Sequence, residues 1–159
     1  MSRFIKDADY DVLIRTEIKN ILLENYSETK LLSAEQMAIS QIKNYLAGRY
    51  DVAAIFTPSP PPSELPVPIF IGRLGEDSRN AFIVMITIDC ALYHLYCSIA
   101  PNKIPEHRSN RYQDVMEWLK MMAEGKGYAD LPLIKDESTG EVKDNFRLSS
   151  NNTFTNNKW

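Results

Sequence analysis

Cysteine and histidine are scarce in this chain, which has 159 residues and only two of each. Cys90 and Cys97 lie seven positions apart in a segment that reads as one helix, where seven residues rise about 10.5 Å. A disulfide needs Cα atoms within about 7 Å of each other. We therefore expect two free thiols, as in proteins of a reducing compartment.

Basic charge is also in short supply. Lys and Arg number 18 against 21 Asp and Glu, which gives a formal net charge of -3. Such a chain has no overall positive field to hold nucleic-acid phosphates, although local lysines could still touch DNA. A dedicated nucleic-acid-binding protein is therefore disfavoured. Residues 1–11 lack an apolar segment typical of a signal peptide, so we expect synthesis in the cytoplasm.

Long hydrophobic runs are limited to one, at residues 81–99 (AFIVMITIDCALYHLYCSI). Asp89 lies near its middle, where a carboxylate costs about 2.5–3.5 kcal/mol on membrane-insertion scales. The run therefore predicts a central core helix and no membrane span.

Recognisable calcium and phosphate motifs are missing. DADYD at 7–11 alternates carboxylates as an EF-hand does, but Val12 and Ile18 stand where that loop needs glycine and glutamate. EGKGY at 124–128 lacks the upstream glycine and the Ser or Thr of a phosphate loop. Capping of a helix explains the first cluster more simply.

A zinc site is the remaining metal hypothesis. Cys90, His94 and Cys97 share one helix face, but no paired CxxC accompanies them and His107 is the only other histidine. We therefore predict no metal, no cofactor and no enzyme, and keep a metal-binding helical regulator as a minor alternative.

Helical periodicity is the strongest pattern in the chain. Residues 7–25 predict one helix or two broken pieces, beginning with Asp7 as a cap. Ser33 followed by Gln36 forms a capping-box pattern, which predicts a second helix starting there. That helix should end at Gly48 in the left-handed conformation, with Arg49 and Tyr50 beyond its end.

Two further helices follow. The apolar helix near 79–99 should stop before Pro101, and the next should begin at Pro105 and end at Gly125. Its buried stripe is expected to comprise Tyr112, Val115, Met116, Leu119, Met122 and Ala123.

Two segments do not fit helices. Six of the twelve residues at 57–68 are proline, which predicts an extended insertion at 57–77, with a short strand or hairpin at 69–74. From Lys126 onward hydrophobic residues become sparse. The expected fold is thus a mainly α bundle of four to five helices at 1–126, with an extended C-terminal arm at 127–159.

Three segments resemble a family of tailed-phage proteins, the Mu-type head–tail connectors, also called adaptor or head-completion proteins. They are IKNYLAGRYDV (42–52), the stretch IDCALYHLYCSIAPNKIPEHRSNRYQDVMEWLKMMAEGK (88–126) and SSNNTFTNNKW (149–159). With its long proline-rich segment at 57–77 and its extended C-terminal arm, the chain is similar to versions in phages of gut bacteria, including crAss-like phages. The motif residues used below are Tyr45, Gly48, Arg49, Tyr50, Asp89, Tyr93, Tyr96, Arg111, Tyr112, Trp118 and Gly125.

The resemblance implies a virion protein that forms a dodecameric ring beneath the portal, joins head to tail and continues the DNA conduit. Its partners would be copies of itself, the portal and further neck or tail proteins, with non-specific DNA contact in the lumen left open and no membrane contact. A tail-completion or stopper ring lower in the neck is the alternative.

The C-terminal arm would then bind the portal or a neighbouring subunit. The anchors expected for that contact are Phe146, Arg147, Leu148, Phe154, Lys158 and Trp159. For Arg49 and Tyr50 two roles remain open, because they could orient the link to the central helix or reach a neighbouring subunit.

Overall fold

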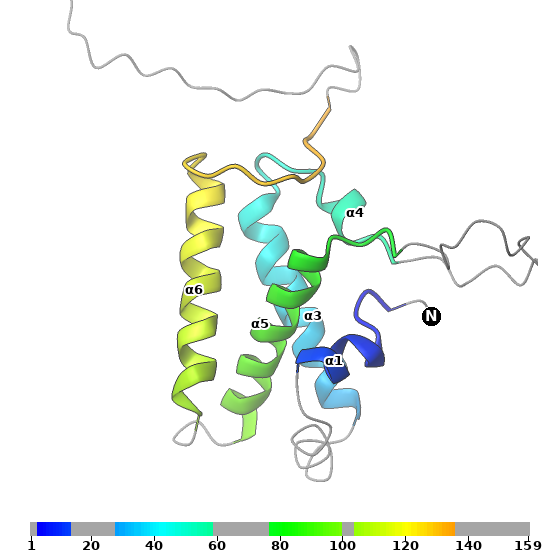
Figure 1. Cartoon of the computed structure of the whole chain (residues 1–159), viewed down its shortest axis with the longest axis vertical. Helices are drawn as coiled ribbons and strands as arrows, with labels where there is room; N and C mark the ends of the chain where they lie inside the picture. The colour runs from blue at the N-terminus through cyan, green and yellow to red at the C-terminus, as the bar shows by residue number, and fades with distance from the viewer. Residues whose placement is uncertain (1–2, 14–27, 59–76, 100–103, 136–159) are drawn as a thin grey trace, which may run out of the picture.

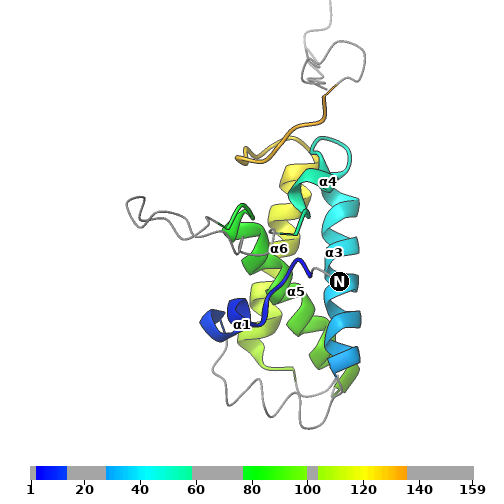
Figure 2. The ribbon, with the colours of Figure 1, turned by 90° about the vertical axis from the view of Figure 1, so that its right-hand side faces the viewer.

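The computed structural model describes residues 3–13, 28–58, 77–99 and 104–135. These residues form a mainly helical bundle, as predicted (Figure 1). The helices are α1 (Asp7–Leu13), α3 (Glu28–Leu46), α4 (Val52–Ile55), α5 (Ala81–Ile99) and α6 (Glu106–Ala123). Each of the three long helices contacts the other two, and α1 packs across α5 (Figures 1 and 2).

The central element is α5, which the sequence predicted at nearly these bounds. Residues 81–98 are long and apolar enough to cross a membrane, yet 56% of this stretch is buried inside the bundle. Ile83, Ile88 and Leu92 are among its fully enclosed side chains, and burying such a side chain stabilises the fold by about 1.5–3 kcal/mol. Asn80 caps the helix, since its Oδ1 accepts from the backbone N–H groups of Phe82 (3.0 Å) and Ile83 (3.2 Å).

The predicted start of α3 at Ser33 is wrong. The helix begins at Glu28, and the Ser33 hydroxyl lies inside it, donating to the carbonyl of Thr29 at 3.0 Å. The buried side of the helix already includes Leu31, two residues before the expected cap. Helical periodicity that begins upstream therefore overrides the local capping pattern.

The predicted left-handed glycine at the end of α3 is also wrong. The helix ends at Leu46, and the turn closes through hydrogen bonds from the N–H groups of Arg49 (3.1 Å) and Tyr50 (3.0 Å) to the Leu46 carbonyl. Gly48 does not take a positive φ. Tyr50 is only 3% exposed, so this side chain packs into the core and does not project beyond the helix.

The predicted end of α6 is confirmed. Gly125 has φ 73°, and its N–H donates to the Met122 carbonyl at 3.2 Å, while that of Lys126 donates to the Met121 carbonyl at 2.9 Å. This pair of bonds is a Schellman motif, in which glycine takes the left-handed position at no steric cost.

Residues 126–135 run back across one end of the bundle (Figure 1). The N–H of Asp51 donates to the Pro132 carbonyl at 2.8 Å, and that of Ile134 donates to the Arg49 carbonyl at 3.2 Å. Ala129 and Leu131 pack against the core. Residues 126–135 are thus fastened to the bundle. The rest of the predicted arm, the expected strand at 69–74 and residues 14–25 of the predicted first helix lie outside the described residues.

Candidate functional site

Asp89 is the buried charge at the middle of α5, and α6 supplies its partners. Arg111 donates from Nε to Oδ1 at 2.9 Å and from Nη2 to Oδ2 at 2.7 Å, and Arg108 donates from Nη1 to Oδ1 at 3.4 Å. The hydrogen bond to Asp89 raises the pKa of Arg111 above its ordinary value. A bidentate ion pair of this kind fixes the relative orientation of the two side chains as well as neutralising the charge. The carboxylate in the apolar run therefore joins two helices.

A second contact set holds all three long helices together. The rings of Tyr93 on α5 and Tyr112 on α6 stack with centroids 3.9 Å apart and an angle of 7°. Gln41 on α3 donates from Nε2 to the Tyr112 hydroxyl at 2.8 Å, and its Oε1 lies 2.9 Å from Nε2 of His94. Since the amide oxygen can only accept, His94 donates from Nε2. Partial burial lowers the pKa of His94 below its ordinary value.

These contacts weigh against a zinc site on α5. Cys90 is fully buried, and burial raises the pKa of its thiol to about 12. The Nε2 atom of His94 is already bonded to Gln41. Within the described residues, no group of three or more His, Cys, Asp or Glu side chains is placed to hold a metal.

Arg49, Tyr50 and Gly125 meet at one end of the bundle. The Tyr50 hydroxyl lies 3.8 Å from Sδ of Met122, and the Arg49 guanidinium carbon lies 6.0 Å from the centroid of the Tyr50 ring. A Cβ atom on Gly125 would come within 2.9 Å of Nη1 of Arg49. Arg49 therefore lies against the turn that follows α6.

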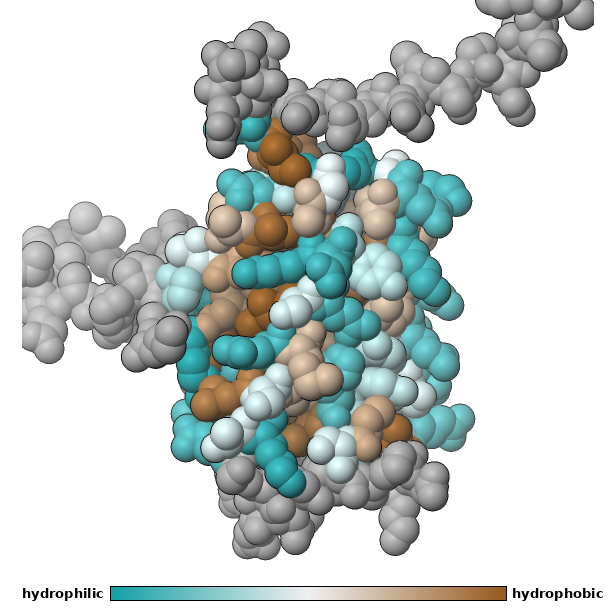
Figure 3. All heavy atoms as spheres, turned by 180° about the vertical axis from the view of Figure 1, so that it is seen from behind, coloured by the Kyte–Doolittle hydropathy of each residue, from teal (hydrophilic) through white to brown (hydrophobic). Residues whose placement is uncertain are grey.

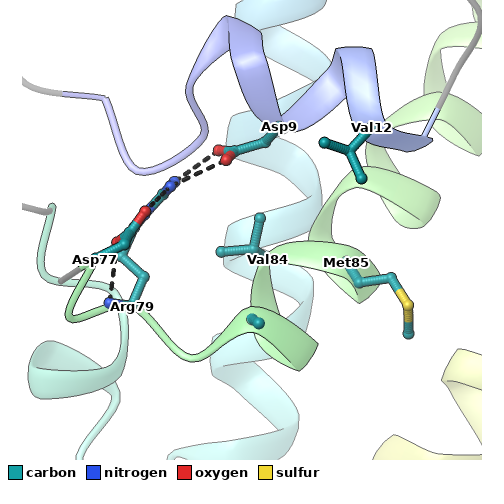
Figure 4. A pocket seen from close by; sticks show the side chains of 7 residues that line it. Asp9, Val12, Asp77, Arg79, Val84 and Met85 are labelled. Atoms are coloured by element: carbon teal, nitrogen blue, oxygen red, sulfur yellow. Dashed lines mark hydrogen bonds and ion pairs between the residues drawn. The ribbon is translucent and has the colours of Figure 1, made fainter. Parts of the chain in front are cut away.

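Arg79 forms a clasp that the sequence analysis missed (Figure 4). Its side chain is 2% exposed and donates to Asp9 on α1 at 2.7 and 3.0 Å, to Asp77, and to the backbone carbonyl of Phe4. Arg79 thereby holds the pKa of Asp77 well below its usual range. The polar turn GEDSRN offered one weak signal, an arginine just ahead of an apolar helix. Its partner Asp9 could not be chosen from spacing.

Glu35 is a second missed residue. It is buried on α3 and accepts from Nη2 of Arg3 at 2.6 Å and from the hydroxyl of Tyr10 at 2.7 Å. Burial and the nearby carboxylate raise the pKa of Tyr10 above its ordinary value. Together with Arg79, this cluster fixes the N-terminal segment against α3 and α5.

An apolar strip crosses α1, α5 and α6. We define it by Val12, Met85, Phe82, Trp118 and Tyr128. The rings of Phe82 and Trp118 meet edge to face at 4.9 Å. Three hollows follow one another along the strip, with volumes of about 410, 230 and 340 Å³. Met85 lines the first and second, while Phe82 and Trp118 line the second and third. Figure 4 shows the first hollow between α1 and α5.

Figure 3 shows the side of the molecule seen from behind. Hydrophilic side chains cover much of it, with apolar residues interspersed (Figure 3).

Among the remaining motif residues, Tyr45 and Tyr96 are partly buried and pack against the core. The arm anchors at 146–159 lie outside the described residues.

Comparison of the chain with family models, with curated proteins and with solved structures gave no match.

Proposed function

We propose that the chain is a structural virion protein, a head–tail connector that forms a ring between portal and tail and continues the DNA conduit. The observation that carries the proposal is that residues of the connector-like motifs contact one another. They come from separate segments, yet Arg49 lies against Gly125 and Tyr50 lies against Met122. Asp89 pairs with Arg111, and Tyr93 stacks on Tyr112.

The architecture suits a ring for a physical reason. Closed rings are built from two different faces that meet head to tail. A bundle of three long helices offers such faces. This one has the apolar strip on α1, α5 and α6, and hydrophilic side chains cover much of the side seen from behind (Figure 3). The described residues present tightly paired charges and no constellation that requires a catalytic step, so the proposal assigns a purely structural role.

The arm supplies the contact with the portal in this proposal. An extended segment gains contact area at the cost of becoming ordered when it binds. Phe146, Phe154 and Trp159 are its aromatic anchors, a residue class that dominates binding energy at interfaces.

The test is to mix the purified protein with the portal of the same phage and to measure the mass of the complex by light scattering. The full-length protein is compared with a variant in which Phe146, Phe154 and Trp159 are replaced by serine, and with Met37→Ser as control, because Met37 is an exposed side chain on α3. We expect a complex with the first and third proteins only. Absence of binding by all three would favour a ring lower in the tail conduit.

A further inference from the structure

The apolar strip leaves hydrophobic surface in contact with water. Val12 is 84% exposed, Phe82 42% and Tyr128 91%. Exposed apolar surface costs about 25 cal/mol per Å² relative to burial, and contiguous patches of it mark interaction sites. The strip is therefore a candidate interaction surface.

The shape of the strip favours inserted side chains over a flat partner. Its three hollows of about 410, 230 and 340 Å³ lie in a row, separated by Met85 and by the Phe82–Trp118 pair. An extended segment can place separate large side chains into successive hollows.

The charge of the strip is negative. The described residues that line the hollows include five carboxylates, those of Asp9, Asp77, Asp89, Asp114 and Asp130, and two guanidinium groups, those of Arg79 and Arg111. Ion pairs hold three of the carboxylates, because Arg79 bonds Asp9 and Asp77, Lys6 bonds Asp77, and Arg108 and Arg111 bond Asp89. The other two, Asp114 and Asp130, are exposed and give the strip its accessible negative charge. An occupant with aromatic and basic side chains would therefore be complementary.

The C-terminal segment of the chain has that composition. Residues 145–159 (NFRLSSNNTFTNNKW) contain no Asp or Glu side chain and two basic residues, Arg147 and Lys158. Their apolar members are Phe146, Leu148, Phe154 and Trp159. We propose that residues 146–159 dock into the apolar strip of their own chain, with aromatic side chains in the hollows and basic side chains beside the carboxylates.

The tether permits this docking. Residues 128–131 already line the third hollow, and the described chain continues only to Lys135. Residues 136–145 then provide ten residues of connection, which span up to about 35 Å when extended. A short flexible tether gives an effective concentration on the order of millimolar, so the chain's own segment outcompetes a second copy at micromolar concentration.

Docking of the segment would regulate the proposed connector. The free protein would keep its arm on the strip, and a portal that captures the arm would also uncover the strip for a neighbouring subunit. The docking itself concerns the isolated chain and does not depend on the connector role, so its test uses no portal.

The experiment is a competition measured by fluorescence anisotropy. A labelled peptide of residues 145–159 is titrated into the full-length protein and into a full-length arm variant in which Phe146, Phe154 and Trp159 are serine. We expect the arm variant to bind the peptide at least tenfold more tightly, because its own segment no longer occupies the strip. Equal affinity for the two proteins, or no binding to the arm variant, would overturn the proposal.

Two further variants locate the site. In the arm variant, Tyr128→Ser with Asp130→Lys should weaken peptide binding at least tenfold, since both residues line the third hollow and Tyr128 is almost fully exposed. Met37→Ser should leave binding unchanged. An equal loss with Met37→Ser, or none with the strip variant, would contradict docking on the strip. Light scattering of the wild-type protein should give a monomer, whereas dimers that the arm substitutions dissolve would assign the segment to a second copy.

Discussion

Removal of the buried carboxylate at Asp89 should be among the most damaging single changes in the bundle. Asp89→Ala would leave Arg108, whose side chain is 10% exposed, without its carboxylate partner and would remove both bonds to Arg111. Breaking a buried ion pair by removing one partner costs about 3–5 kcal/mol. Since small proteins lose about 1–3 kcal/mol of stability per molar urea, the unfolding midpoint should fall by roughly 2 M.

Two matched variants test whether the loss of stability comes from this ion-pair network or from the removal of any charge. Arg111→Ala should cost about 1.5 kcal/mol, because Asp89 keeps the bond from Arg108 at 3.4 Å. Glu117→Ala, which removes an exposed carboxylate from α6, should change stability by less than about 0.5 kcal/mol. Urea unfolding followed by circular dichroism gives all three values. A loss below about 1 kcal/mol for Asp89→Ala would refute the argument that this carboxylate binds α5 to α6.

Three other predictions follow from the same structure. Gly125→Ala should destabilise the protein by about 1–2 kcal/mol because of its left-handed φ of 73°, whereas Gly48→Ala, with open space around its Cβ position, should be neutral or stabilising in thermal unfolding. The raised pKa of Tyr10 means that the folded state favours the protonated hydroxyl, so the resulting stability is present below the ordinary pKa of about 10 and is lost as the pH rises further. Unfolding at pH 8 and 11 should show this loss, and Tyr10→Phe should reduce it. In the native protein at pH 8, a thiol reagent should modify Cys97 quickly and leave Cys90 unreacted until urea is added, as counted by mass spectrometry.

Each of these results has a contrary outcome. Equal effects of the two glycine variants would mean that the left-handed turn is not needed after α6. An unchanged alkaline loss in Tyr10→Phe would assign that loss to other groups. Rapid modification of both thiols would contradict the complete burial of Cys90.

The sequence was sufficient for the elements whose signals are strong and agree with one another. The length of α5 followed from a continuous apolar run, and the end of α6 followed from a glycine placed directly after a buried stripe. Two free cysteines followed from helical rise alone. Local signals failed where a longer pattern competed with them. Ser33 looked like a cap, but the helix had begun five residues earlier, at Glu28.

What the sequence by itself determined is therefore the helical class and the central position of α5, because helical periodicity and a continuous apolar run are properties of a single chain. Only the tertiary structure decided which charges meet. Arg79 clasps Asp9 across 70 positions, and Glu35 receives the hydroxyl of Tyr10 across 25. Such partners depend on how the N-terminal segment lies on the bundle. The apolar strip arises in the same way, since its residues from α1, α5, α6 and the following turn become neighbours only after the helices have packed.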